Sequence, residues 1–141
     1  MDGKIKAIIR HLRENSRDAY VGSVDGGGFP QIKAMFATRH GDLRTHYFST
    51  NTSSARAGQF RKEPKACVYY CDNAMGAAVL FTGAMEVCTD QAHKNMLWKE
   101  GDERYYPKGV TDEDYCVFKF TAETVNFYHN GTVLTVSVDE L

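Results

Sequence analysis

The dipeptide Asn130-Gly131 restricts the fold of this chain more than any other local feature. An Asn-Gly pair is typical of the two-residue turn of a β-hairpin, because both residues tolerate the positive φ angles that this turn needs. Strand-forming residues lie on both sides of it, over residues 115–128 and 133–138. The chain is therefore expected to end in two antiparallel strands.

Strand-forming segments separated by turn residues continue over most of the 141 residues. Further strands are predicted over residues 19–24, 31–38, 43–49, 65–72 and 77–88, with glycine-rich turns between the first three. Helices are predicted over residues 2–12, 55–62 and 90–98, and residues 100–114 are expected to be irregular. Strands and helices do not alternate regularly, which argues against a parallel sheet. We expect a single, mainly β domain over residues 1–141, a small antiparallel barrel of six or seven strands with Greek-key-like connections.

Composition excludes several classes of function. The formal net charge is −1 with acidic and basic residues interspersed, so nucleic-acid binding lacks its electrostatic driver. No stretch of about 18 apolar residues is present, which predicts no membrane span. The absence of a secretory signal predicts a cytoplasmic protein. The four cysteines are expected to be free thiols: Cys67 and Cys71 would lie more than about 10 Å apart on one strand, too far for a disulfide. No Cys–His spacing predicts a metal site.

The segment from Ser49 to Arg56 carries the strongest chemical signal. It leads from a strand through a polar loop into a helix, where free N–H groups and the positive end of the helix dipole favour an anion. Arg56 in the first helical turn is disfavoured by the dipole unless an anion is bound. The pattern predicts a phosphate site. The alternative is an ordinary N-cap by Ser53 or Ser54 with a solvated Arg56. Lys33, alone in an apolar stretch, favours the phosphate, because two cations could nearly neutralise a phosphate ester.

Three segments of the sequence resemble a known family. They are Pro30-Gln31-Ile32-Lys33-Ala34-Met35, His46-Tyr47-Phe48-Ser49-Thr50-Asn51-Thr52-Ser53-Ser54-Ala55-Arg56 and Arg61-Lys62-Glu63-Pro64-Lys65. The chain resembles the pyridoxamine 5′-phosphate oxidase-like FMN-binding split barrels, and within them the general stress protein branch. The resemblance continues to Asp114 and covers almost the whole chain.

The resemblance implies a homodimer with FMN in a cleft at the interface. It assigns the phosphate to Lys33, Ser54 and Arg56. It places the flavin ring against the strand edges around four residues: Met35, Phe36, Ser49 and Thr50. Tyr128 stands where the family usually has a Trp that approaches the flavin of the other subunit. Trp98 is expected to be a core or interface anchor, with a flavin contact as the alternative.

This chain also departs from the family pattern. Lys33 stands where Arg is common, Arg56 stands where Lys is common, and the Arg-x-His substrate motif is missing. Vitamin B6 oxidation is therefore not expected. The remaining hypotheses are an FMN-dependent oxidoreductase of unknown substrate, reduced by NAD(P)H or another small reductant; a non-catalytic protein that binds flavin, deazaflavin or haem, or senses it in a stress response; and an interaction module without cofactor. No catalytic side chain is predicted.

Two other groups of residues are given structural roles. The five histidines are scattered, and surface or structural positions are expected for them. Asp112, Glu113 and Asp114 are expected to form a solvated turn rather than a calcium loop.

Overall fold

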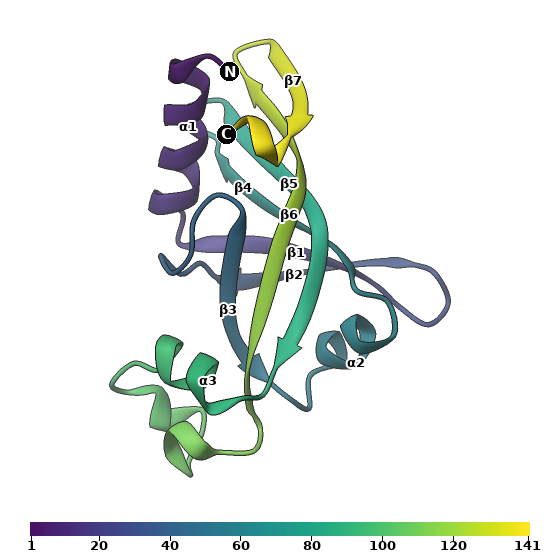
Figure 1. Ribbon diagram of the computed structural model, residues 1–141, viewed down its shortest axis with the longest axis vertical. Helices are drawn as coiled ribbons and strands as arrows, with labels where there is room; N and C mark the ends of the chain where they lie inside the picture. The colour runs from purple at the N-terminus through teal and green to yellow at the C-terminus, as the bar shows by residue number, and fades with distance from the viewer.

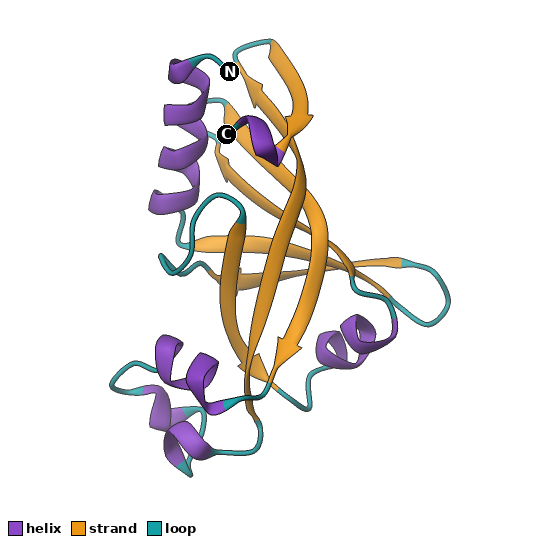
Figure 2. Cartoon of the chain, in the orientation of Figure 1, coloured by secondary structure: helices purple, strands orange, loops and turns teal.

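The computed structural model describes residues 1–141 as a curved antiparallel sheet flanked by short helices (Figures 1 and 2). The strands are β1 (Asp18–Val24), β2 (Pro30–Phe36), β3 (Thr45–Asn51), β4 (Lys65–Asp72), β5 (Ala77–Cys88), β6 (Tyr115–His129) and β7 (Thr132–Ser137). The helices are α1 (Gly3–Asn15), α2 (Ala55–Lys62) and α3 (Gln91–Leu97), with 3₁₀ turns at Asp102–Arg104, Gly109–Thr111 and Val138–Glu140. No helix is both long and apolar enough to cross a lipid bilayer.

The strands form one sheet in the order β2-β1-β4-β5-β6-β3. The long strand β6 pairs with β5 along most of its length, with β3 through its first half and with β7 through its second half. The edge strands β2 and β3 are not paired with each other, so the barrel is not closed. A side-chain bond from Thr38 Oγ1 to the Tyr47 carbonyl, at 2.7 Å, links the two ends near this opening. The predicted mainly β antiparallel fold of six or seven strands is confirmed, with seven strands.

The main core lies on the concave face of the sheet, where alternate strand residues are buried. Val21, Val68 and Phe81 contribute from the strands, and α1 closes this face with Ile9 and Leu12. The helix begins because Asp2 accepts a hydrogen bond from the Lys4 N–H at 2.8 Å. Its apolar stripe then packs on the sheet, as the helical spacing predicted. A smaller core under α3 contains Cys88, Leu97, Tyr106, Tyr115 and Val117.

The convex face of the same sheet carries most of the exposed large apolar side chains. Strand register places six of them on this face: Tyr20, Ile32, Phe36, Tyr69, Tyr128 and Val133. Ile32 is 71% exposed and Val133 is 67% exposed. No helix of the chain covers them, because α1 and α2 pack on the concave side.

Some boundaries differ from the prediction. The second strand ends at Phe36 rather than Thr38, and the third runs from Thr45 to Asn51 rather than from residue 43 to 49. The polar residues Ser49, Thr50 and Asn51 therefore belong to β3, because each pairs with β6. The segment predicted as irregular contains two 3₁₀ turns that carry Tyr106 into the smaller core.

Candidate functional site

The loop before α2 is held from a distant part of the sequence. Asp114 accepts hydrogen bonds from the Asn51 side chain and from the Ser53 N–H, both at 2.8 Å, and its carbonyl accepts from the Thr52 N–H at 2.8 Å. These hydrogen bonds, Asn51 first, lower the pKa of Asp114 below its usual value, so the carboxylate is charged at neutral pH. The prediction of a merely solvated acidic turn was wrong for Asp114, because this carboxylate fixes the loop.

Ser54 is the N-cap of α2, and its hydroxyl accepts from the Ala57 N–H at 3.2 Å. The N–H groups of Thr52, Ser53 and Ser54 are all paired within the chain. Those of Ala55 and Arg56 donate no hydrogen bond. The loop therefore offers fewer free backbone donors than the sequence led us to expect, but both remaining ones lie at the positive end of the helix.

Arg56 supplies a third unpaired donor at this place. Its Nε atom is buried and has no hydrogen-bond partner. A buried guanidinium nitrogen without an acceptor is costly, and a bound anion would satisfy it. The alternative for this segment expected a Ser N-cap and a solvated Arg56: Ser54 is the N-cap, and Arg56 is partly exposed with its Nε buried. The donors of Ala55 and Arg56 together fit the phosphate of a cofactor.

Lys33 faces the same side of the sheet as α2. It pairs with Val21 in β1, and Val21 shares its face with Ser23. The Ser23 hydroxyl donates to the side-chain oxygen of Gln59, one turn after Arg56. Lys33 itself is exposed. The register thus places Lys33 on the side of the sheet against which α2 packs.

The four residues expected along the flavin ring do not share one face. Met35 is buried on the concave side, whereas Phe36 is 61% exposed on the convex side. Thr50 is buried, and its neighbour Ser49 points the opposite way, toward the smaller core and Tyr115. Side-chain contacts from all four to one ligand surface are therefore not possible within a single chain, although backbone groups of both strands lie near the opening between β2 and β3.

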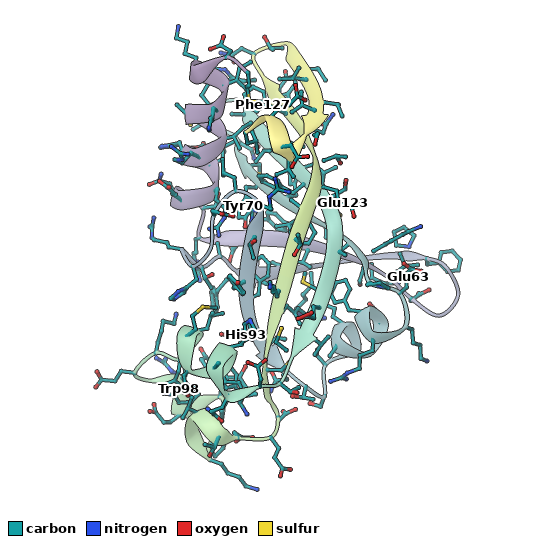
Figure 3. The ribbon with its side chains drawn as sticks, viewed as in Figure 1. Glu63, Tyr70, His93, Trp98, Glu123 and Phe127 are labelled. Atoms are coloured by element: carbon teal, nitrogen blue, oxygen red, sulfur yellow. The ribbon has the colours of Figure 1, made fainter.

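The two aromatic candidates lie at opposite ends of β6. Trp98 follows α3 and packs on Tyr115 and Tyr106, with ring centroids 5.3 and 6.1 Å apart, so it is an anchor of the smaller core (Figure 3). Tyr128 is 46% exposed and pairs with Val133 near the hairpin turn. At about 3.3 Å per residue, Tyr128 is roughly 40 Å along the strand from Tyr115. Within one chain, Tyr128 therefore lies far from the loop before α2, whereas Trp98 packs on Tyr115, the strand partner of Asn51 at the start of that loop.

A buried cation, Lys94, lies near the loop before α2 and was not predicted from the sequence. Lys94 is 6% exposed, and its Nζ donates to the Asp112 carbonyl at 2.9 Å. The Tyr115 hydroxyl donates to the Lys94 carbonyl at 2.9 Å. These hydrogen bonds connect α3 to the segment that contains Asp114. No local sequence pattern predicts them, because a lysine in a short helix is usually a surface residue.

Comparison with known proteins supports the resemblance. The sequence profile described as pyridoxamine 5′-phosphate oxidase matches residues 2–129. A Clostridium acetobutylicum protein related to general stress protein 26 of B. subtilis, of the pyridoxinephosphate oxidase family, is 37% identical; the match covers 99% of each chain with a TM-score of 0.89. No curated protein matches this sequence.

Two more distant structures share the fold. General Stress Protein 26 from Bacillus anthracis str. Sterne is 18% identical over 93% of this chain and 98% of its own, with a TM-score of 0.76. An F420 reductase is 16% identical over 82% of this chain and 94% of its own, with a TM-score of 0.65. The profile match over residues 2–129 and the 37% identical relative establish the family: the chain belongs to the pyridoxamine 5′-phosphate oxidase family.

Proposed function

We propose that this chain binds FMN, with the flavin phosphate held at the start of α2. The unpaired, buried Nε of Arg56 is the observation that carries the proposal. The free N–H groups of Ala55 and Arg56 add two donors, and Lys33 adds a second positive charge. Bound FMN would supply the redox chemistry of its isoalloxazine ring, and the residues named here would bind and orient its phosphate.

Replacing Arg56 by Ala tests the phosphate site. FMN binding to the wild type and to Arg56→Ala is measured by quenching of flavin fluorescence. We expect the variant to bind FMN about 10- to 150-fold more weakly, which corresponds to about 1.5–3 kcal/mol for a charged hydrogen bond. Arg10→Ala, an exposed arginine on α1, is the control and should bind like the wild type. Equal FMN affinity of the wild type and Arg56→Ala would show that Arg56 does not bind the flavin phosphate.

We further propose that the protein works as a homodimer. The bare convex face carries the apolar side chains that a second copy would cover. Phe36 and Tyr128 both lie on that face, so dimerisation would bury them. Dimerisation would also bring Tyr128 of one chain toward a flavin held by the other chain.

An oxidoreductase that takes electrons from NAD(P)H is the activity we favour, because the family profile is that of an oxidase. The alternative is a protein that stores or senses flavin without turnover, in the cytoplasm, where four free thiols would stay reduced. Anaerobic addition of NADH or NADPH to the flavin-loaded protein separates the two. Bleaching of the flavin with repeated turnover after an oxidant is added supports the oxidoreductase; a spectrum unchanged by either donor supports the binding protein.

The identity of the cofactor is tested separately. Because a structural relative is an F420 reductase, the molecule released from the purified protein on denaturation should be identified by mass. We expect FMN. Release of a deazaflavin or haem, or of no cofactor together with no FMN binding in titration, would contradict the proposal.

A further inference from the structure

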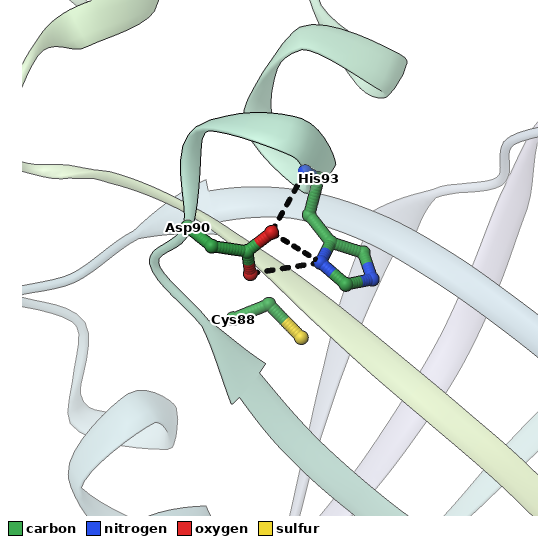
Figure 4. A group of neighbouring side chains, drawn as sticks. All are labelled: Cys88, Asp90 and His93. Atoms are coloured by element: carbon green, nitrogen blue, oxygen red, sulfur yellow. Dashed lines mark hydrogen bonds and ion pairs between the residues drawn. The ribbon is translucent and has the colours of Figure 1, made fainter.

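Three side chains with metal-binding atoms come together where β5 leads into α3 (Figure 4). Cys88 is the last residue of β5, Asp90 is the N-cap of α3, and His93 lies in the first turn of that helix. Their sulfur, oxygen and nitrogen atoms all lie within 4.8 Å of one another. Figure 4 shows the three side chains pointing into one space. The group combines the thiol, imidazole and carboxylate that bind Zn²⁺ in proteins.

Helix capping accounts for only part of this arrangement. Asp90 accepts from the His93 N–H at 3.2 Å, and its two carboxylate oxygens lie 2.8 Å from His93 Nδ1. Neither contact involves Cys88. The Cys88 residue is 4% exposed, and its thiol donates to the Glu86 carboxylate at 3.1 Å. A second carboxylate, that of Glu86, is thus in direct contact with the sulfur, next to the three groups whose ligand atoms converge.

The charges around the group also suit a dication. Glu86 and Asp90 bring two negative charges, and Lys119, the strand partner of Glu86 on β6, brings one positive charge. The ring of Tyr47 lies 6.0 Å from that of His93 and limits the movement of the imidazole on one side. The His93 side chain is 27% exposed, so an ion can reach the group from solvent.

We propose that the β5–α3 junction binds one divalent transition metal ion, with Zn²⁺ as the best fit, through Cys88 Sγ, Asp90 and His93 Nδ1. Zinc–ligand distances of about 2.0–2.3 Å require the ligand atoms to lie roughly 3.5 Å apart. The most distant pair must therefore approach by up to about 1.3 Å, and the Asp90 oxygens and His93 Nδ1, now 2.8 Å apart, must separate; rotation of the partly exposed Asp90 and His93 side chains allows both movements. On metal binding the Cys88 thiol loses its proton to solvent and the thiolate bonds the ion, while the Glu86 carboxylate next to the sulfur adds negative charge beside the site.

Such an ion would join the end of β5 to α3. Cys88 belongs to the smaller core, and α3 contributes Leu97 to the same core. The site is separate from the proposed phosphate site, and the proposal does not depend on FMN binding. A metal that binds the folded chain more tightly than the unfolded chain raises the thermal midpoint of unfolding.

Cobalt is the probe that reports thiolate coordination directly. Reduced, tag-free, full-length protein is titrated with Co²⁺, and absorption is followed in the near-ultraviolet region, where thiolate-to-cobalt charge transfer appears, and in the visible region. We expect one equivalent of Co²⁺ per chain, displaced by Zn²⁺. Cys88→Ser should lose the charge-transfer band, and His93→Ala should bind at least tenfold more weakly. Asp90→Asn keeps the helix cap but removes the charge, and it should also weaken binding.

Matched controls come from the same residue types elsewhere in the chain. Cys67→Ser, a half-buried thiol on β4, and His11→Ala, an exposed histidine on α1, should bind Co²⁺ like the wild type. Absence of stoichiometric Co²⁺ binding at micromolar metal would overturn the proposal. So would equal binding by the wild type and His93→Ala, a variant of a partly exposed side chain that remains informative even if Cys88→Ser fails to fold.

Discussion

His46 is a fully buried ionisable residue in the main core, and its neighbours define its charge state. Its ring lies among those of Tyr70, Phe81 and Phe120. Nε2 lies 2.9 Å from the Leu43 carbonyl, which can only accept, so Nε2 carries the proton; Nδ1 accepts from the Tyr70 hydroxyl at 2.8 Å. The imidazole is therefore neutral. Burial, and then the charge of Arg13, lower the pKa of His46 to about 3.

The lowered pKa of His46 predicts a loss of stability in mild acid. The unfolded chain takes up a proton on this residue near pH 6.5, whereas the folded chain resists protonation down to about pH 3. The contribution is complete above pH 6.5 and declines by up to roughly 1.4 kcal/mol for each pH unit below it. Urea unfolding between pH 7 and pH 5 measures this slope. His46→Gln, which cannot be protonated, should show a shallower slope, and identical slopes in the two proteins would contradict the assignment.

Single residues could be predicted from sequence where their partners are local. Ser54 and Arg56 were selected because a strand, a polar loop and a helix start follow one another within eight residues, and the structure leaves Arg56 Nε without a partner. Asp114 could not be selected, because its partners Asn51 and Ser53 lie 61 or more residues away in sequence. Only the pairing of β3 with β6 brings Asp114 to the loop.

At the scale of elements, the loop between β3 and α2 depends on the Asp114 carboxylate. Asp114→Ala removes the acceptor of two hydrogen bonds, to Asn51 and Ser53. We expect it to lower the free energy of unfolding by about 1–2 kcal/mol and to weaken FMN binding, because the loop before Arg56 loses its tether. Glu113→Ala is the control, since Glu113 is exposed and contributes its backbone carbonyl. Wild-type stability in Asp114→Ala, measured by urea unfolding, would show that the loop holds its shape without it.

Two glycines make a matched pair that tests the sheet and the helix separately. Gly83 lies at the register shift between β5 and β6, where an added methyl group would overlap the Thr121 backbone. Gly83→Ala should destabilise the chain by about 1–3 kcal/mol or more, because the backbone must move. Gly58 lies within α2 with open space around it, so Gly58→Ala should stabilise by about 0.5–1 kcal/mol. Chemical unfolding of both variants measures the change in the free energy of unfolding, and we expect the two changes to have opposite signs.

At the scale of the whole molecule, the pattern of residues predicts the face of each strand but not its neighbours. In the predicted strand 77–88, period-two alternation puts Val79 and Phe81 on one side, and both are buried. The same alternation fits any arrangement of antiparallel strands. The order β2-β1-β4-β5-β6-β3, with β6 shared between β3 and β7, is set by packing of side chains far apart in sequence. For the same reason no local signal indicates the opening between β2 and β3, and the family resemblance implied only that the barrel is split.

The uncovered convex face of the sheet predicts how the protein assembles. Ile32 is 71% exposed and pairs with Gly22 on this face, next to Tyr20. A second copy covering the face would bury Ile32, and a charge there would have no partner, which costs several kcal/mol. Ile32→Glu should therefore raise the dimer dissociation constant at least about 100-fold. Light scattering at micromolar concentration should find a dimer for the wild type and a monomer for Ile32→Glu.

Ala7→Glu, an exposed position on α1, places the same charge outside this face and should remain dimeric. If the flavin site needs both chains, FMN affinity falls in Ile32→Glu and not in Ala7→Glu, although neither residue belongs to the proposed phosphate site. A monomeric wild type would contradict the dimer. A dimer that persists in Ile32→Glu would show that the interface lies on a surface other than the convex face. Unchanged FMN affinity in a monomeric Ile32→Glu would mean that one chain holds the flavin alone, with Arg56 and Lys33 sufficient for its phosphate.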